Sequence, residues 1–117
     1  MSQVIRGWIG LIFICFALTV HAQDFEATKR AAELGDVKAQ FNLGWVYGNG
    51  QGVAKDEAEA VKWYRKAAEQ GDAKAQFNLG LMYANGQGVA KDDSEATKWF
   101  RKAAEQGNKN APKRLPP

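Results

Sequence analysis

Apolar residues recur along most of this chain at the three- and four-residue intervals of helices, not at the two-residue interval of strands. Over residues 36–47, Ala39 and Leu43 fall on one helix face. Phe41 and Trp45, also four positions apart, fall on the opposite side. A helix with apolar groups on two sides can bury both of them only between neighbouring helices, so this pattern predicts a packed helical array.

A second helix is predicted after a glycine-rich turn. Residues 48–52 contain three glycines, which permit the left-handed backbone angles of a tight connection. This segment lacks the Gly-Lys-Ser/Thr ending of a phosphate-binding loop and follows no strand pattern. Asp56 and Glu59 then form a D-x-x-E capping pattern, and Gly71 marks the helix end. Gly44, within the first helix, indicates close approach by another backbone, because glycine there costs about 1 kcal/mol relative to alanine.

The strongest feature of the sequence is an internal repeat of 36 residues. Residues 31–66 align with residues 67–102, and 27 of the 36 positions are identical. A third copy opens over residues 103–107 and then loses the pattern. Chance does not produce such a match, so the sequence predicts a repeat protein in which each unit is a pair of helices.

The two ends of the array depart from the repeat. Residues 24–34 align with the second half of a unit, which predicts a helical amino-terminal cap. At the other end, Pro112 and Lys113 stand where the repeat has a glutamine and a phenylalanine. Proline disrupts a helix interior, and lysine would place a charge in the seam. We therefore expect a repeat domain over residues 23–107, followed by a basic, proline-ended tail over residues 108–117.

The amino-terminal residues 1–22 differ in composition from the rest. A short polar start with Arg6 precedes 14 uncharged residues, 7–20, and small residues follow up to Ala22. This layout is typical of a secretory signal peptide cleaved after Ala22. The apolar stretch is shorter than the roughly 18 residues that a membrane span needs. The alternative is an uncleaved signal that anchors the protein to the inner membrane.

Charge and residue chemistry exclude several functions. Sixteen Lys and Arg against 13 Asp and Glu give a net charge of +3, too weak and too mixed to indicate nucleic-acid binding. Cys15 and His21, the only cysteine and histidine, both lie in the predicted signal. The mature chain would then lack the cysteine and histidine ligands of a tetrahedral zinc site. Its single serine, Ser94, precedes Lys98 by four residues, so the S-x-x-K motif of a serine nucleophile does not form. We therefore predict no catalytic residues, no metal site, no cofactor and no enzyme activity.

The repeated unit L-G-x-x-Y-x-x-G-x-G-V-x-x-D-x-x-x-A-x-x-W-Y/F-x-x-A-A resembles the Sel-1-like repeat, a relative of the tetratricopeptide repeat. The resemblance covers about residues 24–107. Its signature positions are Leu43, Gly44, Tyr47 and Trp63 in the first copy and Leu79, Gly80, Tyr83 and Trp99 in the second. The resemblance implies an all-α fold: a short α-solenoid of antiparallel helix pairs with about five helices, made of two full repeats and the helical cap. It also implies binding to other proteins, and bacterial members are often exported and act as adaptors or regulators in the envelope.

The candidate contact residues lie on the first helix of each unit, where the two copies differ. Trp45 in the first copy is replaced by Leu81 in the second. In related solenoids these helices line the concave surface, so we select Trp45, Phe41, Phe77 and Leu81 as candidate partner-binding residues. Phe41 and Phe77 are also explained by packing between neighbouring helices. For Trp45, a core position and a contact position both remain open.

We therefore expect an exported, non-catalytic module, periplasmic or secreted, that binds a protein or peptide on its concave face. The alternative is a self-associating structural repeat protein, a homo-oligomer without an external partner. Contact with a glycan is a third possibility, and only the aromatic side chains of the first helices, Phe41, Trp45 and Phe77, support it. A hydrolase of the β-lactamase type, described for cysteine-rich relatives, is the least supported, because the mature chain would lack cysteine.

Stability follows from the number of repeats. An array of two and a half units has close to the smallest number of repeats that can be stable, since about three repeats are normally needed to bury a continuous core. We expect modest stability, with Trp63 and Trp99 buried.

Overall fold

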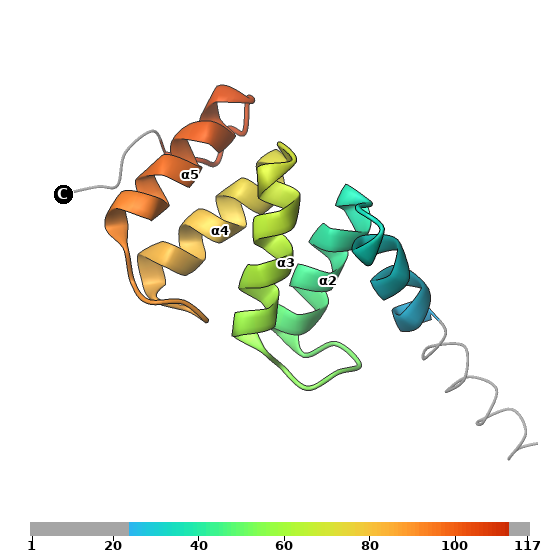
Figure 1. The fold of residues 1–117 in the computed structure, drawn as a ribbon. Coiled ribbons are helices and arrows are strands. Elements are labelled where there is room, and N and C mark those ends of the chain that lie inside the picture. Colours follow the sequence, from blue (N-terminus) through green and yellow to red (C-terminus); the bar gives the residue numbers. More distant parts are fainter. Residues whose placement is uncertain (1–23, 113–117) are drawn as a thin grey trace, which may run out of the picture.

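The computed structural model describes residues 24–112, and this part of the chain is an array of antiparallel helices with no strand (Figure 1). A first helix covers residues 24–33. It is followed by α2 (Val37–Asn49), α3 (Glu57–Glu69), α4 (Ala73–Asn85) and α5 (Asp93–Glu105). The predicted all-α solenoid with five helices is confirmed. The predicted signal peptide, residues 1–22, and the end of the predicted tail, residues 113–117, lie outside the described residues.

An aspartate begins each helix from α2 to α5, as the capping patterns predict. The Asp36 carboxylate accepts a hydrogen bond from the Ala39 amide at 2.9 Å, and the Asp56 carboxylate accepts one from the Glu59 amide at 3.1 Å. The reciprocal half of a capping box does not form at Asp56, because the Asp56 amide donates to the Tyr47 carbonyl at 2.9 Å instead. The capping residue Asp56 therefore connects the start of α3 to the last turn of α2 through this backbone hydrogen bond.

The helices pack in chain order, so each one contacts its predecessor and its successor. α2 packs on α3, α3 on α4, and α4 on α5 (Figure 1). The helix over residues 24–33 covers the free side of α2, where the rings of Phe25 and Tyr47 meet edge to face with centroids 6.0 Å apart. This helix occupies the place predicted for the amino-terminal cap.

The glycines within α2 and α4 allow close approach by aromatic rings, not by another backbone as we expected from the sequence. A Cβ atom on Gly44 would lie 2.6 Å from the Tyr64 ring, and one on Gly80 would lie 2.7 Å from the Phe100 ring. Both distances are far shorter than van der Waals contact. At each glycine, an aromatic ring from the second helix of the same unit therefore packs directly against the helix backbone.

Buried glutamines connect successive units, a feature that the sequence analysis did not identify. The Gln40 side-chain amide donates to the Ala32 carbonyl at 3.1 Å, and its oxygen accepts from the Gln70 amide at 2.8 Å. The second unit repeats this arrangement with Gln76, which donates to the Ala68 carbonyl at 3.1 Å and accepts from Gln106 at 2.7 Å. Because both partners are supplied, these polar side chains are buried without a large desolvation cost.

The chain stays in contact with the array after α5 ends. The Asn108 side-chain amide donates to the Ala73 carbonyl at 3.5 Å, and the Ala111 amide donates to the Asn108 carbonyl at 3.2 Å. Ala111 is buried. The helical part thus ends at the predicted position near Gly107, while residues 108–112 pack against the last unit as a short turn.

Candidate interaction groove

The signature residues of the repeat are mostly core residues. Among them, Leu43, Leu79, Trp63, Trp99 and Tyr83 are buried, and Tyr47 is half-buried. Trp63 packs with Ala32, Ala39 and Leu43, so that one ring joins three consecutive helices. These positions hold the scaffold together and leave little surface for a partner.

The candidate contact residues divide into two pairs. Phe41 and Phe77 are half-buried, and their rings lie 5.6 Å from Tyr64 and 5.8 Å from Phe100, centroid to centroid. Trp45 and Leu81, at equivalent positions of α2 and α4, are 46% and 38% exposed. The structure therefore places the phenylalanines against the second helix of their own unit and leaves Trp45 and Leu81 partly exposed.

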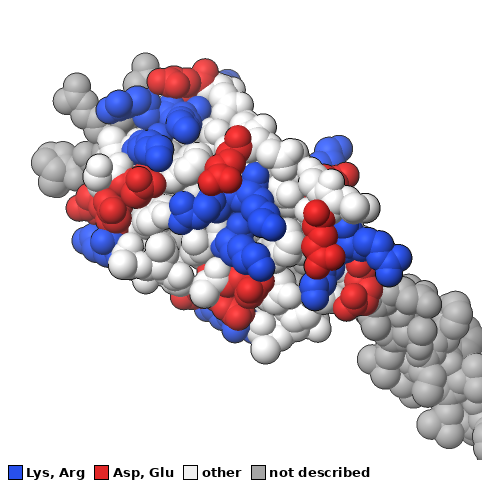
Figure 2. All heavy atoms as spheres, in the orientation of Figure 1, with Lys and Arg blue, Asp and Glu red and all other residues white. Residues whose placement is uncertain are grey.

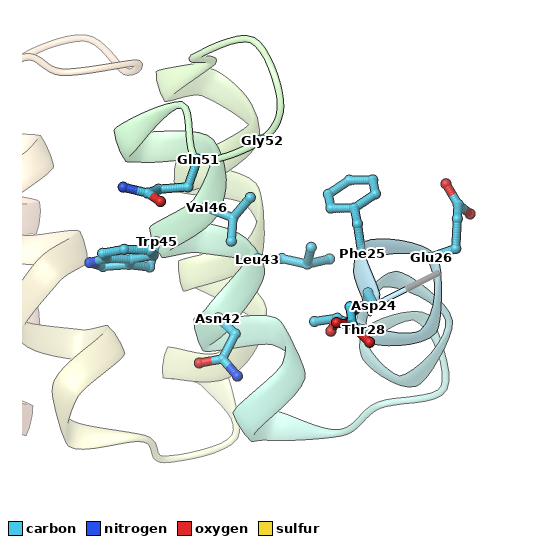
Figure 3. A pocket seen from close by; sticks show the side chains of 10 residues that line it. All are labelled: Asp24, Phe25, Glu26, Thr28, Asn42, Leu43, Trp45, Val46, Gln51 and Gly52. Atoms are coloured by element: carbon cyan, nitrogen blue, oxygen red, sulfur yellow. Dashed lines mark hydrogen bonds between the residues drawn. The ribbon is translucent and has the colours of Figure 1, made fainter. Parts of the chain in front are cut away.

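An open groove of about 940 Å³ lies along α2, beside the helix over residues 24–33 (Figure 3). Its lining residues are Asp24, Phe25, Glu26, Thr28, Asn42, Leu43, Trp45, Val46, Gln51 and Gly52. In Figure 3, Leu43 and Val46 point toward the first helix, whereas Trp45 lies on the opposite side of α2. The groove therefore has a mainly apolar floor between Phe25 and α2, whereas the Trp45 side chain extends from the other side of α2.

Of the predicted candidates, only Trp45 lines this groove. Sequence reasoning did not select Phe25, Thr28, Asn42 or Val46 as contact residues. A usable signal was present, because residue 28 aligns with Tyr64 and Phe100 in the two full units but is a threonine in the cap. The cap therefore departs from the repeat at a core position, which distinguishes Thr28 but none of the α2 residues.

Charges are mixed over the surface. Figure 2 shows Lys and Arg side chains interleaved with Asp and Glu over the visible face. The ion pairs among the described residues join exposed side chains, such as Lys62 with Glu59 at 3.9 Å and Lys98 with Glu95 at 3.7 Å. Pairs of this kind contribute only about 0–1 kcal/mol each. They favour solubility more than stability.

The Tyr64 hydroxyl group is the one titratable group of the described core whose pKa is clearly displaced. Burial raises the pKa of Tyr64 above its ordinary value of 10.0, and a side-chain hydrogen bond with Asn78 of α4 opposes part of this effect. The neighbouring Arg65 guanidinium donates to the Tyr83 hydroxyl and lies 5.5 Å from the centre of that ring. Both tyrosines therefore link α3 to α4.

Stability is expected to fall at alkaline pH because of Tyr64. The unfolded chain loses the phenol proton at about pH 10, before the folded protein does, so the contribution of the neutral ring is complete below that pH and is lost as pH rises through the folded pKa. Tyr64→Phe removes this dependence, and Phe100 at the equivalent position shows that the ring alone is accepted. Urea unfolding from about pH 9 to about pH 11 should show a shallower loss in the variant; equal slopes would contradict the assignment.

The polar groups that line the groove include the Thr28 hydroxyl and the carboxylates of Asp24 and Glu26. The hydroxyl donates to the Asp24 carbonyl at 2.8 Å, an ordinary helical contact. Within residues 24–112, no group of three or more His, Cys, Asp and Glu side chains is placed to hold a metal ion. No helix in this part of the chain is long and apolar enough to cross a membrane.

Comparison with known families settles the class of protein. The Sel1 repeat family model matches residues 37–72 and 73–108. The chain belongs to the Sel1 repeat family. The matched units have the same 36-residue period as the repeats at 31–66 and 67–102 but begin six residues later, at the start of α2 and α4. Sel1 repeat folds are commonly protein–protein interaction modules and are typically non-catalytic scaffolds.

Solved structures show the same fold. A Sel1 repeat protein from Oxalobacter formigenes is 49% identical with a TM-score of 0.73 over 74% of this chain and 36% of its own. The c5321 protective antigen of uropathogenic Escherichia coli, described as displaying an SLR fold, is 54% identical with a TM-score of 0.68 over 69% of this chain and 17% of its own. Helicobacter pylori cysteine rich protein B is 33% identical with a TM-score of 0.74 over 78% of this chain and 68% of its own.

This Sel1 repeat protein thus spans about a third of the first of these chains and about a sixth of the second. No curated protein matches it significantly.

Proposed function

We propose that this Sel1 repeat protein is a non-catalytic adaptor or regulator of the cell envelope that binds another polypeptide on the surface of α2 and α4. The exposure of Trp45 is the observation that carries the proposal. Trp45 is 46% exposed, whereas Trp63 and Trp99 are each 3% exposed in the same array. Tryptophan dominates interface energetics when a partner covers it, so an exposed indole on an interaction scaffold is a strong candidate anchor.

Leu81 extends this surface to the second unit. It is 38% exposed at the position equivalent to Trp45, so both units present one large apolar side chain to solvent from their first helix. The α2 and α4 helices carry no acidic residue, which leaves these side chains among lysine, asparagine and apolar neighbours. A partly apolar surface without carboxylates suits a polypeptide partner.

The envelope location rests on the sequence of residues 1–22, which has the layout of a secretory signal. Cell fractionation of a strain expressing the full chain with a carboxy-terminal tag tests it. We expect the tagged protein in the periplasm or the medium at the mass of the chain cleaved after Ala22. Retention in the cytoplasm at full mass would contradict export.

Partner binding is tested by crosslinking in cells followed by capture of the tagged full chain. Trp45→Ala should reduce capture of the partner about tenfold or more, because loss of a central aromatic anchor costs upward of about 1.4 kcal/mol. Leu34→Ala is the matched control, since Leu34 is 83% exposed but lies at the end of the first helix, away from the groove residues. Circular dichroism establishes that both variants fold.

The outcome separates the adaptor from the self-associating alternative. A partner that wild type and Leu34→Ala capture and Trp45→Ala loses supports the adaptor. Capture of the protein's own chain alone, unchanged by Trp45→Ala, would overturn the proposal and favour a homo-oligomer.

A further inference from the structure

We propose that a basic band on α3 and α5 binds an acidic, extended segment of a polypeptide. The basic band consists of four lysines on the exposed side of these helices: Lys62, Lys66, Lys98 and Lys102. It lies on other helices than Trp45 and Leu81, so it adds a second interaction surface to the one proposed above.

The charged residues along one face of α3 follow a fixed order. Positions 59, 62, 66 and 69 are three or four residues apart, which places them on the same face of a helix. They are Glu59, Lys62, Lys66 and Glu69, and α5 repeats the order with Glu95, Lys98, Lys102 and Glu105. Each helix therefore has two cations in its middle and a carboxylate toward either end.

A buried tryptophan brings the two lysines of each helix together. Lys62 Nζ lies 5.4 Å and Lys66 Nζ 4.7 Å from the centre of the Trp63 ring. Over Trp99, the corresponding distances are 5.3 Å for Lys98 and 4.7 Å for Lys102. The ring attracts both ammonium groups, which holds two like charges near each other and raises the local positive potential. Each unit thus has one positive centre.

The positive charge of each centre is only partly neutralised within the protein. Glu59 pairs with Lys62 at 3.9 Å, and Glu95 pairs with Lys98 at 3.7 Å. Lys66 and Lys102 are exposed and form no ion pair with another residue of the part that the structure describes. Each centre therefore has one ammonium group that is available to an external carboxylate.

The two positive centres lie along the array. Figure 2 shows Lys and Arg side chains over the middle of α3 and α5, with Asp and Glu side chains toward the helix ends. Only α4 is packed between these two helices. Because packed helices are about 8–10 Å apart, the centres lie within about 20 Å of each other. About six extended residues cover that distance.

The carboxylates on both sides of the basic band favour a narrow ligand. Glu69 and Glu105 are exposed on one side, and Glu59 and Glu95 lie on the other. A flat anionic membrane would meet these carboxylates together with the lysines, and the repulsion would offset the attraction. An extended polypeptide with acidic side chains can follow the lysines and pass between the two rows of carboxylates.

The direct test is an NMR titration of the full chain with the capped peptide Glu-Glu-Gly-Ser-Gly-Ser-Glu-Glu. We expect the signals of Lys66 and Lys102 to shift and the affinity to fall as salt is added. The same peptide with Gln in place of every Glu should bind at least about tenfold more weakly, because it cannot form the ion pairs. Equal binding of the two peptides, or shifts confined to α2 and α4, would overturn the proposal.

The decisive variant combines Lys66→Gln and Lys102→Gln. We expect it to bind the Glu peptide about tenfold more weakly, since each positive centre loses its available ammonium group. The matched control combines Lys38→Gln and Lys74→Gln, which remove the same charge from exposed positions of α2 and α4. It should bind nearly as wild type does. Equal weakening by both variants would show a response to net charge alone and would overturn the proposal.

A variant that gains affinity excludes misfolding as the explanation. Glu59→Gln with Glu95→Gln removes the carboxylates that compete for Lys62 and Lys98, so we expect binding of the Glu peptide to strengthen about two- to fivefold. Glu57→Gln with Asp93→Asn changes the charge equally at the first turn of the same helices, on another face, and should have a smaller effect. An equal gain in both would contradict the proposed place of binding.

Two further measurements separate this surface from the proposed function and from other anions. Trp45→Ala should bind the Glu peptide as wild type does, whatever its effect on capture of a partner in cells. Loss of peptide binding in folded Trp45→Ala would show that the two surfaces are not separate and would overturn the proposal. Tighter binding of anionic phospholipid vesicles or of an oligothymidylate than of the Glu peptide would also overturn it.

Discussion

Trp63→Ala is expected to lower the free energy of unfolding by about 3–5 kcal/mol, the usual cost of removing a buried tryptophan side chain. The ring is 3% exposed and packs with Ala32, Ala39 and Leu43 from the first two helices. Its loss opens a cavity where three helices meet. Against a typical total of about 5–15 kcal/mol, this change alone can unfold the protein.

Urea denaturation followed by circular dichroism measures the effect. Trp63→Phe is a sharp comparison, because the buried Trp63 Nε1 donates no hydrogen bond among the described residues, so phenylalanine loses volume but no hydrogen bond. It should therefore cost clearly less than alanine. Trp45→Ala is the exposed control, and we expect a change within about 0.5 kcal/mol.

Trp99→Ala should behave like Trp63→Ala, since Trp99 is also 3% exposed and has the same place in the second unit. A shift of only a few degrees in the melting temperature of both variants would contradict the structural role of these rings. Equal losses for Trp63→Ala and Trp45→Ala would contradict the contrast between core and surface on which the proposed function rests.

Gly44→Ala is expected to destabilise the protein by about 1–3 kcal/mol, the range for overpacking a close-packed core. The new Cβ would lie 2.6 Å from the Tyr64 ring, which is buried between α2, α3 and α4. Alanine has the better helix propensity by about 1 kcal/mol, so the two effects oppose each other. We expect the steric effect to win, because the Tyr64 ring is packed against Phe41 and cannot retreat freely.

Gly48→Ala is the matched control on the same helix. Its Cβ would lie 3.6 Å from the Ala60 methyl carbon, an ordinary contact, and the second unit already has Ala84 at this position. With no clash, only the propensity gain remains, so this variant should be unchanged or more stable by up to about 1 kcal/mol. Denaturant unfolding of both variants checks the pair. Stabilisation by Gly44→Ala would show that the Tyr64 ring does not pack against the backbone at Gly44.

Much of the fold could be predicted because it is encoded in local chemistry that recurs every 36 residues. The aspartates that begin the helices act on amides three residues away, as at Asp36 and Ala39. The glycines that end α2 and α4, Gly50 and Gly86, have φ values of 67° and 65°, which side chains other than glycine rarely adopt. Such effects need no tertiary context, so the sequence by itself determined the helices, their ends, the repeat and the family.

Tertiary structure decided what each side chain does, because stacking joins residues far apart in the chain. Gln70 and Gln40 are 30 positions apart and become hydrogen-bond partners only when α3 folds back on α2. Trp45 and Trp63 have similar chemistry, yet one faces solvent and the other joins three helices. Phe25 and Val46 likewise line one groove, although 21 positions separate them in the chain, because the first helix packs beside α2. Helical periodicity specifies a face, whereas the neighbour that covers that face, or leaves it open, is specified by the packing of successive units.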